Sequence, residues 1–184
     1  MAAAWGIDAS ALPAANGRAG DALLAAAATG QVKALIVAGV ELSDYADPAA
    51  AMAAVDGAAF VVSLENHHSA VTERADVVLP VAAVSEKAGT FLNWEGRPRV
   101  FGQVFRDALM ASDARVLGMI ADAMDVAFPG DVRAIRAELG ALGPWTGARF
   151  AVPADAAGSA AEGVVLASWR QLLDAGLMQA GEPH

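Results

Sequence analysis

The stretch Ala34-Leu35-Ile36-Val37-Ala38, closed by Gly39, is a continuous apolar run with the length and composition of a parallel strand buried on both faces. Two similar runs follow at residues 59–64 and 75–80. Between the first two, Asp47-Pro48 provides an acidic cap and a first-turn proline for a short helix ending at Val55. Strands separated by helical segments are typical of parallel sheets. The sequence therefore predicts an α/β fold with a parallel sheet flanked by helices.

The rest of the chain predicts further helices and one long loop. Helices are expected at residues 20–29, 112–127 and 129–139, where alanine or an apolar stripe dominates. The first of them has Asn16 or Asp21 as its cap and Gly30 just past its end. Periodicity fades over residues 81–100, where glycine and proline interrupt the sequence, so a long ordered loop is expected there.

These elements predict one main domain followed by a helical, partly irregular C-terminal extension. The α/β domain is expected to span residues 1–142. Residues 143–163, rich in alanine, glycine, aspartate and serine, have the composition of a linker. Residues 164–184 are expected to begin with an amphipathic helix and to lead toward a C-terminal domain that the chain does not contain.

Composition excludes several classes of function. The chain of 184 residues is 56% hydrophobic and 18% charged, which is far from the composition of disordered proteins. Its net charge of −9 argues against nucleic acid and anionic membrane surfaces, because binding phosphate requires clustered cations. With no cysteine, it can supply no disulfide and none of the thiolates that usually hold iron–sulfur clusters. The N-terminus lacks a secretory signal and no apolar run reaches bilayer length, so a cytoplasmic protein without membrane insertion is expected.

Motifs of catalysis and metal binding are scarce. No Gly-x-Ser-x-Gly elbow or phosphate-binding P-loop occurs. His67-His68 lies near Glu65 and Glu73, but adjacent histidines on an extended segment point to opposite faces. A polar loop at the carboxyl end of the second strand is favoured over a metal site. No catalytic, cofactor-binding or metal-ligating residue is assigned.

The segment between residues 86 and 106 reverses the acidic character of the chain. It contains Lys87, Arg97, Arg99 and Arg106 against only Glu86 and Glu95. Arginines could hold a nucleotide pyrophosphate, because each guanidinium presents a planar fork of donors. The alternative, which we favour, is that the two glutamates pair with the arginines and pin the loop.

Two aromatic residues, Phe91 and Trp94, lie in the same segment. Large apolar side chains in a loop either anchor it to a core or fill a pocket on a partner. Anchoring to the core is the favoured interpretation.

The runs Ala75-Asp76-Val77-Val78-Leu79-Pro80 and Gly89-Thr90-Phe91, with Glu86-Lys87 between them, resemble the third domain of the molybdopterin oxidoreductase family. Within that family, Asn93-Trp94-Glu95-Gly96-Arg97 resembles the branch of large iron–sulfur subunits of NADH:quinone oxidoreductase, respiratory complex I. Formate dehydrogenases and nitrate reductases usually carry a second arginine where Gly96 stands. The resemblance covers residues 34–125 well and implies a Rossmann-like sheet.

The chain departs from the cofactor-binding relatives at two places. Gly39-Val40-Glu41-Leu42 keeps the glycine of the family's Gly-Glu-Asn-Pro loop and loses its Asn-Pro. Ser69-Ala70-Val71 stands where those relatives carry Thr-Glu-Thr. The resemblance thus implies a domain that kept the fold and lost the molybdenum site.

The resemblance further implies a scaffold in the peripheral arm of an NADH:quinone oxidoreductase, contacting other subunits of that arm and lying peripheral to the inner or plasma membrane. Iron–sulfur clusters would be held by polypeptide that precedes this chain, and this part would itself carry no catalytic residue. One alternative is a fragment of a molybdopterin-dependent enzyme such as formate dehydrogenase. Another is a nucleotide-binding module with Lys87 and Arg97 on phosphate.

Overall fold

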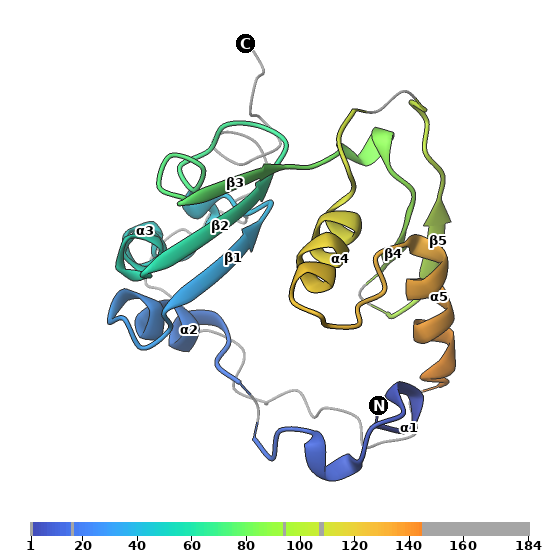
Figure 1. The fold of residues 1–184 in the computed structure, drawn as a ribbon. Helices are drawn as coiled ribbons and strands as arrows, with labels where there is room; N and C mark the ends of the chain where they lie inside the picture. The colour runs from blue at the N-terminus through green and yellow to red at the C-terminus, as the bar shows by residue number, and fades with distance from the viewer. Residues whose placement is uncertain (1, 16, 94, 107–108, 145–184) are drawn as a thin grey trace, which may run out of the picture.

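The computed structural model describes residues 2–15, 17–93, 95–106 and 109–144, which form an α/β fold with two sheets (Figure 1). The helices are α1 (Ala2–Trp5), α2 (Gly20–Ala28), α3 (Pro48–Gly57), α4 (Asp113–Ala123) and α5 (Val132–Ala141), with 3-10 turns η1 (Ala9–Ala11), η2 (Leu42–Asp44) and η3 (Val84–Glu86). The strands are β1 (Ala34–Ala38), β2 (Phe60–Glu65), β3 (Val77–Pro80), β4 (Gly89–Leu92) and β5 (Pro98–Phe101).

The predicted parallel sheet is confirmed, with strand order β1-β2-β3. Its register places Ala34 beside Phe60 and Val62 beside Val77. The Asp76 carboxylate, one residue before β3, accepts a hydrogen bond from the Val61 amide at 2.7 Å. This bond ties the beginning of β3 to β2, because it satisfies a buried backbone donor that would otherwise lack a partner.

Helices α2 and α3 cover one face of this sheet. The cap expected for α3 is present, since the Asp47 side chain accepts from the Ala50 amide at 3.0 Å and Pro48 occupies the first turn. Helix α2 ends as predicted before Gly30, whose φ of +72° suits a residue without Cβ. The predicted cap of this helix is wrong, because Ala19 occupies the N-cap position without a side-chain hydrogen bond and Asp21 lies inside the first turn. The core on this face is made by Leu42, Ala51, Val55, Val61 and Val71.

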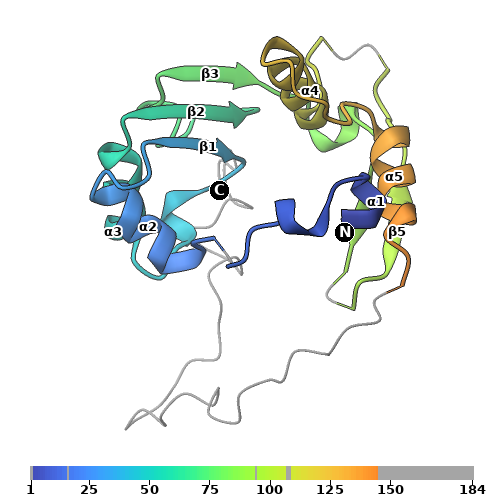
Figure 2. The same cartoon turned by 60° about the horizontal axis from the view of Figure 1, so that its bottom comes forward.

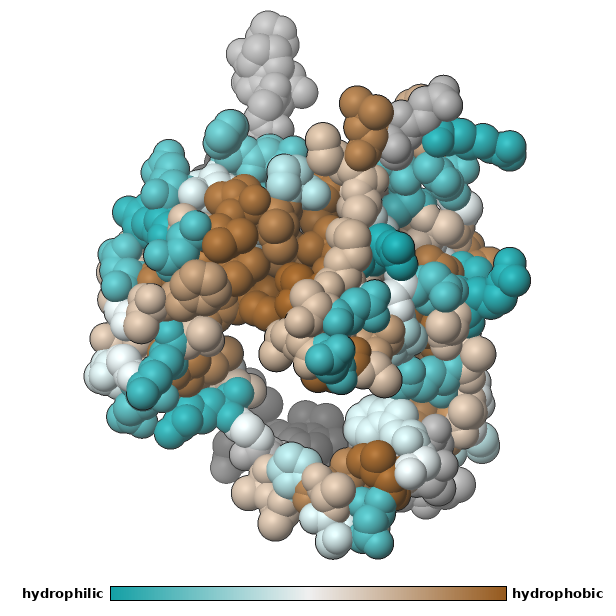
Figure 3. All heavy atoms as spheres, viewed as in Figure 1, coloured by the Kyte–Doolittle hydropathy of each residue, from teal (hydrophilic) through white to brown (hydrophobic). Residues whose placement is uncertain are grey.

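The opposite face of the sheet is only partly covered, so the prediction that residues 34–38 are buried on both faces is wrong. Helix α4 lies beside the carboxyl ends of the strands, where Val116 packs against Leu64 and Val81 (Figure 2). Farther along the same face, Ile36 is 58% and Phe60 45% exposed. Figure 3 shows the resulting hydrophobic surface over the strands. An apolar run shows that a strand can be buried, but the neighbours that would bury it are absent from the described residues.

The loop expected over residues 81–100 is also corrected. It contains η3 and an antiparallel pair, β4 and β5, in which Gly89 lies opposite Phe101 and Leu92 opposite Pro98. Each strand has four residues, too few for alternation to be read from the sequence once glycine and proline are among them.

The two predicted C-terminal helices exist with shifted ends. Helix α4 starts as expected after Ser112, which caps it, but ends at Ala123 because Asp125 adopts a φ of +57°. Helix α5 begins at Val132, since the Asp131 carboxylate accepts from the amides of the next turn. The linker and terminal helix predicted beyond residue 144 lie outside the described residues. Within the part of the chain that is described, no helix is both long and apolar enough to cross a membrane.

Candidate functional site

The β4–β5 ribbon is closed by a turn that the side chain of Asn93 organises. Its Oδ1 accepts from the amides of Glu95, at 3.1 Å, and Arg97, at 2.8 Å. Gly96 supplies the φ of +78° that the turn needs, and its amide donates to the Asn93 carbonyl. The Asn-x-Glu-Gly-Arg pattern therefore encodes the geometry of a turn.

Replacing Asn93 with alanine is expected to reduce the free energy of opening of the ribbon by about 1–2 kcal/mol, because two backbone donors lose their acceptor. Hydrogen exchange at the amides of residues 95 and 97 measures this change. The control is Arg99→Ala, because within the described residues the Arg99 side chain donates only to the neighbouring Pro98 carbonyl, at 3.0 Å. Equal exchange rates in the two variants would contradict the role of Asn93.

Phe91, an aromatic residue of β4, does not reach a core. Phe91 stacks on Phe101 with ring centroids 4.6 Å apart, yet it remains 57% exposed. The prediction that Phe91 anchors the segment to a core is therefore wrong, since its ring contact lies within the two-stranded ribbon. The ring of Phe101 also explains why position 89 is a glycine, because a Cβ at this position would lie 2.5 Å from the Phe101 Cζ. Trp94 lies outside the described residues.

Only part of the predicted charge pairing is confirmed. Arg97 Nε lies 3.2 Å from a Glu95 carboxylate oxygen, as expected. The Glu86 carboxylate instead accepts from the Ala83 amide at 3.0 Å and so caps η3. Lys87 pairs outside the ribbon, with Asp113 in the first turn of α4. A pairing between positions 26 residues apart left no local signal in the sequence.

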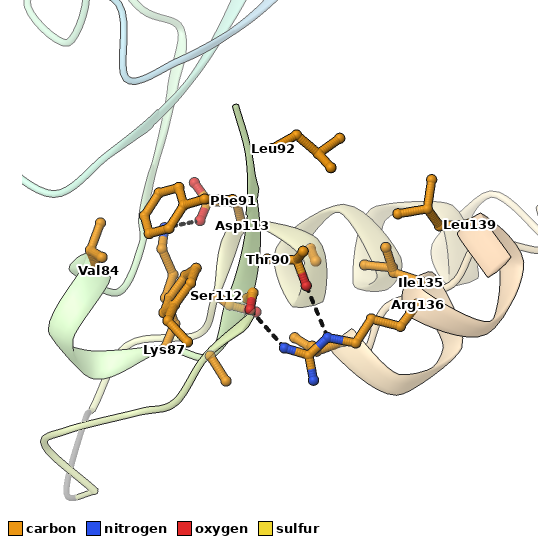
Figure 4. Close-up of a pocket in the computed structure, with 15 residues that line it drawn as sticks. Val84, Lys87, Thr90, Phe91, Leu92, Ser112, Asp113, Ile135, Arg136 and Leu139 are labelled. Atoms are coloured by element: carbon orange, nitrogen blue, oxygen red, sulfur yellow. Dashed lines mark hydrogen bonds and ion pairs between the residues drawn. The ribbon is translucent and has the colours of Figure 1, made fainter. Parts of the chain in front are cut away.

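A hollow of about 520 Å³ lies between β4, the start of α4 and α5 (Figure 4). Arg136 reaches from α5 to β4, where its Nη2 donates to the Gly89 carbonyl at 2.6 Å and its Nε to Thr90 Oγ1 at 2.9 Å. The walls are mostly apolar, with Leu92 on the strand and Leu139 on the helix. Sequence reasoning missed this site, because Arg136 and the strand it meets are nearly fifty residues apart.

The candidate metal ligands are not brought together. His67 Nδ1 lies 2.7 Å from the Asn66 side-chain oxygen, and both His67 and His68 are exposed. Glu65 is buried at the end of β2, whereas Glu73 is exposed farther along the chain. Among the described residues, no group of three or more potential ligands could hold a metal ion. His67 and His68 lie in the polar loop that the sequence predicted after the second strand.

The carboxyl edge of the parallel sheet, where α/β folds commonly bind nucleotides, is poor in cationic side chains. Residues 39–45, 66–69 and 81–83 leave the three strands there and contain no lysine or arginine. Their Glu41 carboxylate accepts from Ser43 instead, capping η2. A pterin dinucleotide carries an anionic pyrophosphate that needs cations or free amides. These segments offer no lysine or arginine side chain to such a group.

Comparison with known proteins gives the family. The molybdopterin oxidoreductase model matches residues 4–111. The G subunit of NADH-quinone oxidoreductase from Streptomyces coelicolor is 51% identical over 99% of this chain, and that from Mycobacterium bovis is 50% identical over all of it. The G subunit from Escherichia coli O6:H1 is 33% identical over 48% of the chain.

The chain spans 22% and 24% of the length of the Streptomyces and Mycobacterium relatives. These matches confirm the resemblance, seen in Asn93-Trp94-Glu95-Gly96-Arg97, to the large subunits of NADH:quinone oxidoreductase. Since the family model covers more than half of the chain, the protein belongs to the molybdopterin oxidoreductase family.

Proposed function

We propose that this chain is a structural part of the G subunit of an NADH:quinone oxidoreductase, supporting electron transfer from NADH to quinone without itself holding a redox group. About half of the residues are identical to those of known G subunits over nearly the whole chain. This identity supports the first half of the proposal, that the chain is part of a G subunit. The carboxyl edge of the sheet, where residues 39–45, 66–69 and 81–83 contain no lysine or arginine, supports the second half.

Under this proposal, the iron–sulfur clusters lie outside this chain. Iron–sulfur clusters usually require cysteine thiolates, and this chain has no cysteine. The clusters would therefore be bound by the rest of the G subunit and by neighbouring subunits. The role of this part is to hold surfaces in position for those neighbours within the peripheral arm, on the cytoplasmic side of the membrane.

The ion pairs at the ribbon support a structural role. Lys87 and Arg97, the two cations of the nucleotide-binding alternative, are both engaged with carboxylates, Asp113 and Glu95. The first pair connects the segment before β4 to α4, and the second stiffens the turn. Cations already paired in this way are poorly placed to bind a nucleotide, because each new contact would first break an existing one.

The test uses the full-length G subunit, tagged and purified with its complex from the organism that encodes it. We expect the tag to recover NADH:quinone oxidoreductase activity, with iron present and molybdenum far below one atom per copy of the tagged protein. Elemental analysis and pterin fluorescence after oxidation make the measurement. One molybdenum and a pterin per copy would instead support a molybdopterin-dependent enzyme such as a formate dehydrogenase, and recovery without NADH:quinone oxidoreductase would refute the assignment altogether.

A further inference from the structure

Helix α5 carries an apolar stripe that nothing in the described structure buries. Ile135, Leu139 and Leu142 recur at the spacing of one helical face and are 36%, 43% and 40% exposed. No residue of α5 is buried. A helix of ten residues with an open apolar face gains little stability from packing, so its face is suited to meeting another surface.

The stripe faces β4 across the hollow described above. Figure 4 shows Ile135 and Leu139 on the helix and Leu92 on the strand, with the Arg136 side chain crossing between the two elements. Leu92 is 56% exposed. The hollow is within the size range of about 300–1,000 Å³ that binding pockets have. It forms an apolar slot with Arg136 along one side.

Arg136 contributes a charge that no carboxylate of the described residues neutralises. Its two bonds go to neutral oxygens, the Gly89 carbonyl and Thr90 Oγ1, and it takes part in none of the ion pairs. The other charged groups that line the hollow, Lys87 and Asp113, pair with each other. A ligand that fits the slot therefore has an apolar part and a negative charge.

The exposed side chains around the hollow favour a protein over a small molecule as its ligand. Val100, on the partner strand β5, does not line the hollow and is 70% exposed. A small molecule inside the slot would leave this side chain in water, whereas a protein surface would cover it. Pairing of two copies through this face is disfavoured, because a symmetric contact would bring Arg136 of each copy toward the other.

We propose that the slot between Leu92, Ile135 and Leu139 receives an apolar side chain that stands beside an aspartate or glutamate on a neighbouring subunit, with the carboxylate bound by Arg136. This inference rests on the proposed function and names the contact through which the domain acts as a scaffold. Because anchors of this kind carry much of the binding energy of an interface, the contact would be an important one.

The experiment places the photoreactive residue p-benzoylphenylalanine at position 92 of the full-length G subunit in the assembled complex. After illumination, mass spectrometry identifies the residue that is joined to position 92. We expect a residue of another subunit that lies directly beside an aspartate or glutamate. Adducts confined to the G subunit itself or to lipid, or a partner site without an acidic neighbour, would overturn the proposal.

Two substitutions test the chemistry of the slot. Arg136→Glu is expected to lower the yield of the cross-link about tenfold, because the buried charge pair becomes a repulsion. Arg133→Glu, at an exposed position of the same helix that does not line the hollow, is the matched control and should leave the yield unchanged.

Leu139→Asp is the second variant, because it places a negative charge in the slot and leaves the bonds of Arg136 to β4 intact. Yields equal to the control in both variants would refute the contact. A tagged protein that does not purify with the oxidoreductase overturns both proposals, whereas normal purification without the cross-link overturns only this one.

Discussion

Replacing Leu64 with alanine is expected to lower the free energy of unfolding of the chain by about 2–5 kcal/mol, the range measured for large-to-small changes in cores. Leu64 is 1% exposed near the carboxyl end of β2 and contacts Val81 and Val116. Its truncation removes contacts between the parallel sheet and α4. The lost stability then has two parts, the hydrophobic free energy of the removed atoms and the cost of the cavity that remains.

Urea denaturation followed by far-ultraviolet circular dichroism measures this effect. Leu109→Ala is the matched control, because Leu109 is 93% exposed and loses almost no contact. We expect the control to change the free energy of unfolding by no more than about 0.5 kcal/mol. A similar midpoint for both variants would show that the cluster around Leu64 does not join the sheet to α4.

Substituting Gly57 with alanine is expected to destabilise the chain by about 1–3 kcal/mol, the usual cost of overpacking. A Cβ at this position would lie 2.6 Å from the Ala28 carbonyl oxygen and 2.7 Å from the Ala28 Cα. These are backbone atoms that cannot rotate away, so α2 and α3 would have to move apart. The close approach of the two helices therefore depends on the missing side chain.

Gly140→Ala provides a control with the opposite expected sign. Gly140 lies within α5, and a Cβ there meets nothing within 4 Å. Alanine at this open helical position should raise the free energy of unfolding by up to about 1 kcal/mol, because glycine loses more backbone freedom than alanine on folding. Thermal unfolding of the two variants should shift the midpoint in opposite directions, and a lower midpoint for both would contradict the explanation.

The parallel sheet could be predicted because its signals are local. Each strand is a mostly apolar run, uninterrupted in β1, and Asp47-Pro48 marks the beginning of the helix between the first two. The sequence could not predict which face of the sheet is covered by other parts of the structure. The half-exposed Ile36 has the same local sequence signal as a buried strand residue, because burial depends on polypeptide from elsewhere.

The candidate site was harder to predict because its contacts connect distant positions. The sequence indicated that Arg97 would pair with a carboxylate of its own segment, and it does, but Asp113 as the partner of Lys87 had no local signal. Arg136 was missed entirely, since its role is set by the packing of α5 beside β4. The four-residue strands around Asn93 are too short for a periodic pattern to show, and their pairing depends on the turn between them.

The open face of the parallel sheet also affects how the chain behaves at high concentration. Apolar strand surface such as that around Ile36 and Phe60 favours association between copies, and long-range charge repulsion opposes it. The net charge of −9 provides this repulsion at neutral pH, but it vanishes near the isoelectric point of about 4.6 and is screened by salt. The acidic composition that argued against nucleic acid therefore also opposes association of copies through the exposed face of the sheet.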